Sequence, residues 1–187
     1  MSSSARDGVV TAVIAIVAES GFEGLSVRAV AARAGVSVGA VQHHFPTKAE
    51  MLTAAMASIA TGAAERYGEL EKIEDPAERL SALVDRLLPA DAQNVVARIW
   101  LALAARATVD DAAAAAYADL WGRMRAGLRL LLPAAGGRAD TAEQDATELL
   151  ALLDGLAVSI VAEDGRIDPA RARRIAHRRV AELIGPR

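Results

Sequence analysis

Apolar residues recur along this chain at the spacing of α-helices, and signals for strands are nearly absent. Near the start, five aliphatic residues lie on one face when the sequence is wound at helical pitch: Val9, Val10, Val13, Ile14 and Val17. This pattern predicts a helix over residues 6–20, which Gly21 ends. Because helical spacing continues through the rest of the chain, we expect an all-α fold.

Capping and helix-breaking residues divide the apolar pattern into about nine helices. Ser26, Ser37 and Thr47 are good N-caps, because their hydroxyl oxygens accept hydrogen bonds from the first helical turn. Gly35 suits the left-handed end of a helix, and Pro46 prevents the preceding helix from continuing. After residues 6–20, the predicted helices run at about 27–34, 38–44, from 48, 76–88, 91–108, 110–133, 141–163 and from 169.

One window, residues 26–48, contains no Asp or Glu. It holds Arg28, Arg33 and Lys48, although the whole chain has a formal net charge of -3. DNA carries a dense row of phosphates that repels carboxylates, so a surface that contacts DNA is expected to lack them. The first-turn N–H groups beside Arg28 and Lys48 also favour anions. The window is therefore the predicted contact with a double-stranded DNA operator.

The two short helices of this window, joined by Ala-Gly-Val-Ser, have the pattern of a helix-turn-helix motif, whose second helix enters the major groove. Small Gly39 and Ala40 allow close approach of that helix, and Gln42 can pair bidentately with adenine. Phe22 and Phe45 are expected in the core behind it. The predicted DNA-binding residues are Ser26, Arg28, Ser37, Val38, Gly39, Ala40, Gln42, His43, His44, Thr47 and Lys48.

Several of these residues also fit a role without DNA. Arg28 and Lys48 are compatible with solvated surface charges, and the histidines with plain packing. His43 and His44 point about 100° apart on a helix, so they do not share one metal ion, which would need a spacing such as HxxxH. We therefore expect no metal site, and we expect Arg33 to be a surface charge at the end of its helix.

The residues around this motif resemble the DNA-binding domain of tetracycline-repressor-like (TetR family) regulators. The resemblance rests on G-F-E-G-L-S-V-R-A-V-A-A-R-A-G-V-S-V-G-A-V-Q-H-H-F-P-T-K-A-E-M-L and covers about residues 6–52. It implies an all-helical homodimer of about nine helices, three of them in the N-terminal DNA-binding domain. We place that domain at 1–50 and the ligand-binding and dimerisation domain at 51–187. Many members carry Tyr where this chain has Gln42, so a different contact is expected there.

The later part of the chain is more loosely similar to the subgroup that includes the choline-responsive betaine regulator. The similarity covers about residues 85–160 and indicates the placement of helices, not a shared ligand. The family implies an unknown small-molecule effector, and the predicted pocket consists of bulky residues: Trp100, Leu103, Tyr117, Trp121 and Met124. Alternatively, these aromatic residues fill a core that is otherwise built from Ala and Leu.

A wide apolar stripe on residues 141–162 and the last helix form the predicted dimer interface, for which burial within one chain is the alternative. A dimer is also expected on physical grounds, because one recognition helix reads few base pairs and two heads read a palindrome. The predicted interface residues are Leu149, Leu153, Leu156, Ala157, Ile160, Ile175, Arg178 and Leu183.

Composition narrows the range of functions. The chain has no cysteine, which removes disulfides, thiolate metal sites and cysteine nucleophiles. No apolar run approaches the length of a membrane span, and the first apolar stretch lacks a signal-peptide cleavage site, so a cytoplasmic protein is expected. The sequence has no Gly-rich phosphate loop, HExxH motif or nucleophile with an evident base. We therefore expect neither an enzyme nor a cofactor.

These observations predict a sequence-specific transcriptional regulator, most simply a repressor that a small molecule releases from a palindromic operator. The alternative is a nonspecific or architectural helical DNA-binding protein without a ligand. The acidic net charge disfavours this alternative, because nonspecific binding depends on many phosphate contacts.

Overall fold

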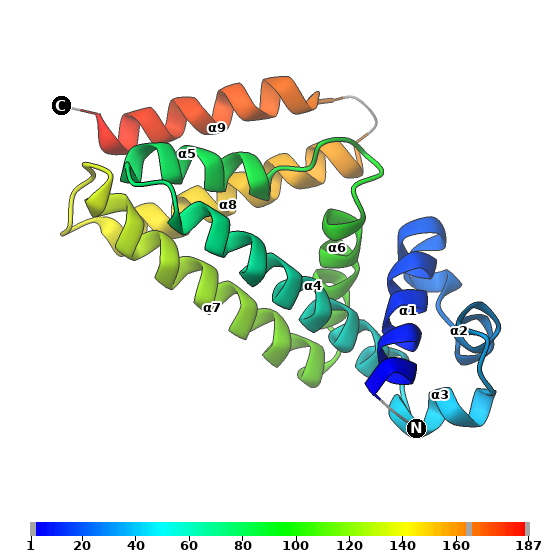
Figure 1. The fold of residues 1–187 in the computed structure, drawn as a ribbon. Helices are drawn as coiled ribbons and strands as arrows, with labels where there is room; N and C mark the ends of the chain where they lie inside the picture. The colour runs from blue at the N-terminus through cyan, green and yellow to red at the C-terminus, as the bar shows by residue number, and fades with distance from the viewer. Residues whose placement is uncertain (1–2, 164–165, 186–187) are drawn as a thin grey trace. The chain divides into compact units, whose positions relative to one another are not determined.

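The computed structural model describes residues 3–163 and 166–185, and the regular elements in these ranges are all α-helices (Figure 1). The nine helices are α1 Ser3–Gly24, α2 Val27–Ala34, α3 Val38–His44, α4 Lys48–Glu71, α5 Pro76–Leu87, α6 Val95–Ala107, α7 Asp111–Ala134, α8 Ala142–Val161 and α9 Pro169–Ile184. The predicted all-α fold of about nine helices is confirmed. None of these helices is both long and apolar enough to cross a membrane.

The predicted caps form at the helices of the carboxylate-free window. The Oγ atom of Ser26 accepts a hydrogen bond from the Ala29 N–H at 3.1 Å. Ser37 Oγ accepts one from the Ala40 N–H, also at 3.1 Å. Gly35 ends α2 with φ 66° and ψ 30°, the left-handed conformation that favours glycine. The boundaries of α2 and α3 therefore follow from local sequence.

One boundary differs from the sequence prediction, and one needs a closer description. Helix α6 starts at Val95 instead of residue 91, because the Asn94 side chain accepts a hydrogen bond from the Ala97 N–H at 3.0 Å. The range of α1 continues to Gly24, but it consists of two helical segments that meet at Gly21, so the predicted stop at Gly21 is confirmed. Gly21 interrupts the helical geometry, since its φ is 66° and its ψ is -172°.

The chain divides into two compact units. The first consists of Met1–Gly62 and Gln93–Ala118, and the second of Ala63–Ala92 and Asp119–Arg187. Helices α4 and α7 therefore contribute residues to both units. These units are defined by compactness, whereas the predicted boundary near residue 50 separates DNA binding from ligand binding and dimerisation. That functional boundary stays a prediction.

The first unit holds the two short helices. In it, α1 packs against α2 and α6, and α2 packs against α3. Val13, Leu25 and Met51 are completely buried, and Phe45 is only 3% exposed. The core of this unit thus fixes α2 and α3 on the side of α1.

The second unit has its own aliphatic core, in which α9 packs against α5 and α8 (Figure 1). Leu80, Leu128 and Leu149 contribute fully buried side chains from three different helices. Ala172 and Ala176 are also fully buried and let α9 approach closely. Leu and Ala thus supply most of the packing, as the composition predicts.

Most residues of the predicted dimer interface lie inside this core. Six of the eight are at most 7% exposed in the single chain: Leu149, Leu153, Leu156, Ala157, Ile160 and Leu183. Ile175 is half-buried and Arg178 is exposed. Side chains so enclosed leave little area for a partner, so packing within the chain explains the apolar stripe of α8. A homodimer stays a prediction, and it would use the outer faces of α8 and α9.

Candidate nucleic-acid interface

Helices α2 and α3 are joined by a short turn that the backbone closes itself. The Val36 N–H donates to the Ala31 carbonyl at 3.1 Å, and the Gly35 N–H donates to the same oxygen. These two bonds satisfy the last turn of α2, because the left-handed Gly35 reverses the chain. Phe45 N–H donates to the Val41 carbonyl at 2.8 Å and ends α3. The two short helices are therefore locked by local contacts.

Burial determines which side of α3 is available to a ligand. Val41 and Phe45, four residues apart, point into the core of the first unit. The opposite side of the helix is exposed, and it carries four of the predicted DNA-binding residues: Val38, Gly39, Gln42 and His43. Val38 is 41% exposed although it is aliphatic, so it offers an apolar contact such as a thymine methyl accepts.

Gly39 is exposed, and the described residues leave the space beside its Cα open. Its φ is not positive, and a Cβ built on it would lie 4.0 Å from the nearest atom beyond the helix backbone, the Ser37 Oγ atom. A larger residue would therefore fit as far as the chain itself is concerned. Absence of a side chain at an exposed helix position does, however, allow another molecule to approach the backbone closely.

The cations of the window fall into two groups. Arg33 donates to both carboxylate oxygens of Glu19, at 2.6 and 2.7 Å, and these hydrogen bonds hold the pKa of Glu19 below its usual value. Arg28 and Lys48 are exposed and form no ion pair with any described residue. Arg33 thus connects α2 to α1, whereas Arg28 and Lys48 keep their charge for an external anion.

Hydroxyl groups flank these cations at the helix starts. Thr47 Oγ1 accepts a hydrogen bond from the Glu50 N–H at 3.1 Å, so Thr47 caps α4 as Ser26 and Ser37 cap the two helices before it. Capping uses a lone pair of each hydroxyl oxygen and leaves its O–H free to donate. Three donors of the kind that phosphates accept therefore lie in the predicted surface.

The two histidines differ in their surroundings. His43 is exposed, whereas His44 is half-buried and its buried Nε2 atom has no hydrogen-bond partner among the described residues. Their rings meet edge-on, with centroids 5.2 Å apart. In the described part of the chain, no three His, Asp or Glu side chains come together as a ligand set for a metal ion. His43 is the better placed of the two to contact DNA.

The predicted effector-pocket residues are distributed over both units. In the first, the rings of Trp100 and Tyr117 lie 6.5 Å apart between centroids, and Leu103 is 1% exposed. In the second, Trp121 and Met124 are half-buried and pack against the aliphatic core. Each group is accounted for by the packing of its own unit, and the pocket that would unite them stays a prediction.

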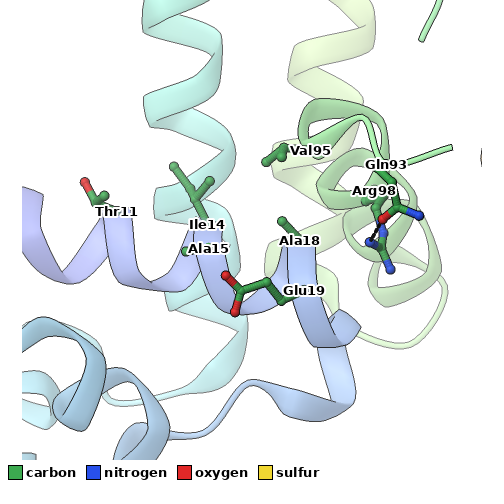
Figure 2. A pocket seen from close by; sticks show the side chains of 8 residues that line it. All are labelled: Thr11, Ile14, Ala15, Ala18, Glu19, Gln93, Val95 and Arg98. Carbon is green, nitrogen blue, oxygen red and sulfur yellow. Dashed lines mark hydrogen bonds between the residues drawn. The ribbon is translucent and has the colours of Figure 1, made fainter. Parts of the chain in front are cut away.

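A groove that sequence patterns do not indicate lies in the first unit, between α1 and α6 (Figure 2). Its volume is about 670 Å³. Ile14, Ala15 and Ala18 of α1 supply apolar lining, with Val95 on the α6 side. Arg98 lies beside Gln93 and donates to its side chain at 3.0 Å. The lining comes from segments more than 70 residues apart in sequence, so only the tertiary fold brings it together.

One carboxylate of the second unit lacks the partners that its burial would require. Asp154 is half-buried on α8, and burial raises its pKa to about 7. Within residues 3–163 and 166–185, no hydrogen bond or ion pair is made by its side chain. Its helical neighbours four residues away are Leu150 and Val158, both aliphatic. Asp154 is therefore an unmatched acid in an apolar setting.

Comparison with known proteins places these features in a family. The model of bacterial regulatory proteins of the tetR family matches residues 10–55, and the model of the BetI-type transcriptional repressor C-terminal domain matches residues 76–185. The chain is 27% identical over 184 residues to the HTH-type transcriptional regulator PksA of Bacillus subtilis. This match covers 95% of this chain and 89% of PksA. It is 29% identical over 175 residues to the HTH-type transcriptional regulator BetI of Burkholderia ambifaria, and this match covers 92% of this chain and 90% of BetI.

Solved structures agree with this assignment. A transcriptional regulator from Rhodococcus sp. Rha1 is 36% identical, has a TM-score of 0.85 and covers 95% of this chain and 94% of its own. A putative transcriptional regulator from Saccharomonospora viridis, solved in complex with choline, has a TM-score of 0.90 over the full length of both chains. At 23% identity, the second similarity establishes the fold.

Fold, exposed α3 face and family matches together define a helix-turn-helix DNA-binding regulator. The chain belongs to the tetR family of bacterial regulatory proteins and has the C-terminal domain of BetI-type transcriptional repressors. It is a DNA-binding regulator of the repressor type, not an enzyme. The resemblance inferred from the sequence is confirmed in both of its parts.

Proposed function

We propose that this repressor binds a palindromic operator as a homodimer through the exposed face of α3, and that a small organic cation releases it. The observation that carries the proposal is the exposed surface of residues 26–48, which contains no carboxylate. Gln42 and Val38 would read base edges, while Arg28 and Lys48 would hold phosphates. Two such heads about one DNA turn apart would select a palindrome.

Helix α4 is the proposed connection between DNA and effector. It begins at Lys48, beside the predicted phosphate contact, and continues to Glu71. The side chain of Tyr67, which the sequence suggests as the far end of this connection, lies outside the described residues. An effector that prefers one position of α4 would alter the spacing of the two heads, and operator affinity would fall by the difference in its affinity for the two states.

The unmatched carboxylate of Asp154 supports an organic cation as the effector class. A half-buried acid without a partner is stabilised by a cation that brings its own apolar surface. Asp154 lies in the BetI-type domain, and the Saccharomonospora viridis structure of the same fold contains choline. We therefore use choline and larger quaternary ammonium compounds as the probes.

The release experiment measures operator affinity with and without effector. Purified protein is first used to enrich a binding duplex from a random library, and its affinity is then measured at fixed salt with increasing quaternary ammonium compound. The proposal predicts a fall in operator affinity that saturates with the compound. Tight binding of the compound without any change in operator affinity would contradict the coupling.

A variant pair tests the role of Asp154 in the same experiment. Asp154→Asn is expected to abolish the increase in melting temperature that the compound produces in the wild type. Asp119→Asn is the matched control, because Asp119 is exposed and, among the described residues, pairs only with Arg123 on its own helix, at 2.7 Å. If both variants respond like the wild type, Asp154 is not the anchor, whereas an unresponsive wild type rejects this class of effector.

A further inference from the structure

The chain contains only two phenylalanines, and each carries a cation on its ring. The Lys48 Nζ atom lies 5.6 Å from the centroid of Phe22. The Arg6 Cζ atom lies 5.3 Å from the centroid of Phe45. Both pairs belong to the first unit, and each joins residues that are distant in sequence. A cation over an aromatic face is attracted by the partial negative charge of that face, which comes from the quadrupole of the ring. Both cationic side chains are therefore held in place.

Stacking of this kind positions a cation without neutralising it. A guanidinium group that rests on a ring keeps its N–H donors at the edge of its plane. A carboxylate partner would instead occupy those donors, as Glu19 does with Arg33 at 2.6 and 2.7 Å. Arg6 is exposed and forms no ion pair with a described residue, so its charge is oriented and still available.

The position of Arg6 places it next to the predicted DNA surface. Phe45 directly follows His44 and is the residue that ends α3. Figure 1 shows the N-terminal end of α1 beside α3, within the first unit. Lys48, the other cation on a ring, opens α4 three residues after Phe45. Arg6 thus lies at the end of α3 that leads to Lys48, one of the predicted phosphate contacts.

From this geometry we infer that Arg6, held on the ring of Phe45, is a further DNA-backbone contact of the repressor. It lies outside the carboxylate-free window and is adjacent to Asp7, so the charge pattern of the sequence does not single it out. The inference rests on the proposed mode of DNA binding and adds a third cation to Arg28 and Lys48. Phe45 is then a positioning residue as well as a core residue.

The test compares the salt dependence of DNA binding among charge-matched variants. Arg6→Gln is expected to lower affinity for an enriched operator and for a mixed-sequence duplex alike, by about eightfold per bound head at 0.1 M salt, and to reduce the salt slope by about one unit per head. Lys48→Ala, the positive control, should behave in the same way. Arg33→Gln, the matched negative control, loses the same charge from the same unit but should leave the slope unchanged.

Two further readouts separate DNA contact from folding. Arg6→Lys should restore most of the salt slope, because the charge remains, whereas a purely structural role would not depend on the salt concentration. Melting temperatures identify any variant that is unfolded at the temperature of the binding assay. Equal slopes for Arg6→Gln and the wild type, or equal losses for Arg6→Gln and Arg33→Gln, would overturn the inference. If the wild type bound no duplex at all, the proposed function itself would be wrong.

Discussion

Charged side chains are used differently in the two units. On the second unit, most arginines bond to acids of the same chain: Arg125 and Arg129 to Glu143, Arg138 to Asp140, Arg166 to Glu163, and Arg179 to Glu148 and Glu182. In residues 26–48 of the first unit, Arg28 and Lys48 have no such partner among the described residues. Surface pairs contribute little to stability, so the important difference is which charges remain available.

The exceptions in each unit support the same distinction. In the first unit, Arg33 pairs with Glu19 and connects two helices instead of facing DNA, and Arg106 pairs with Asp110. In the second unit, Arg171, Arg174 and Arg178 are exposed on α9 and make no salt bridge with a described residue. These three are spaced to share one side of α9, next to the face that a partner subunit would use.

The largest expected effect is a loss of stability on changing a residue of the chain's own core. Leu149→Ala should lower the free energy of unfolding by about 2–5 kcal/mol, because Leu149 is completely buried and its loss leaves a cavity. Urea denaturation measures this. Leu130→Ala is the matched control and should cost less than about 0.5 kcal/mol, since Leu130 is 68% exposed. A small loss at Leu149 combined with weaker dimerisation would show instead that the α8 stripe faces a partner.

On the exposed face of α3, a substitution is expected to weaken DNA binding and not stability. Gln42→Ala should cost about 1–3 kcal/mol at one base position and relax the preference there, because Gln42 is exposed and able to pair with a base edge. Selection of bound sequences from a random library measures the change. Gln144→Ala, on α8, is the control and should leave the selected sequence intact. An unchanged preference in Gln42→Ala would mean that another side of α3 reads the DNA.

Asp154 is a residue of the second unit that weakens its own fold. Because burial raises its pKa to about 7 from an ordinary value of 3.8, the folded state holds a proton that the unfolded state has lost between these pH values. Stability contributed by this site is therefore present at low pH and is lost as pH rises through that window. Asp154→Asn should be more stable than the wild type by about 1–2 kcal/mol at pH 8, after allowance for solvent access, and about equal to it near pH 4. Identical pH profiles of unfolding would contradict the predicted shift.

Gly39→Ala should change stability and DNA binding in opposite directions. An alanine in a helix is favoured over glycine by about 0.5–1 kcal/mol, and the space around Gly39 is open, so thermal stability should rise slightly. Affinity for DNA should fall if the backbone of α3 approaches the groove closely. Gly127→Ala on α7, where space is also open, should raise stability without affecting DNA binding. A variant at Gly39 that binds DNA normally would show that α3 does not need such a close approach.

Local features of this fold follow directly from sequence, because they depend on neighbouring residues. Ser26, Ser37 and Gly35 cap their helices as expected, and the N-caps Asp75 and Asp168 precede a proline in the first turn. The family and the all-helical architecture could be predicted from the sequence for the same reason, because a helix-turn-helix is a short, continuous stretch of sequence.

Contacts between distant segments were not predictable in this way. The stripe of α8 is equally apolar whether it faces its own chain or a partner, so sequence alone left both open, and the structure buries Leu149 and Leu153 in the chain's own core. Arg6 meets Phe45 only through the packing of the first unit. Asn94 is the actual N-cap of α6, although Asp91 also has a capping side chain. Residue type alone does not choose between two such caps.

The most direct test of DNA reading by α3 is selection of bound sequences from a random duplex library with effector-free protein, followed by footprinting of the enriched duplex. Two heads that bind through this helix should select a palindrome whose half-sites lie about one helical turn apart, protected on both halves. Enrichment of no sequence by protein that has been unfolded and refolded to remove bound ligand would contradict this, because the exposed face of α3 would then read no DNA.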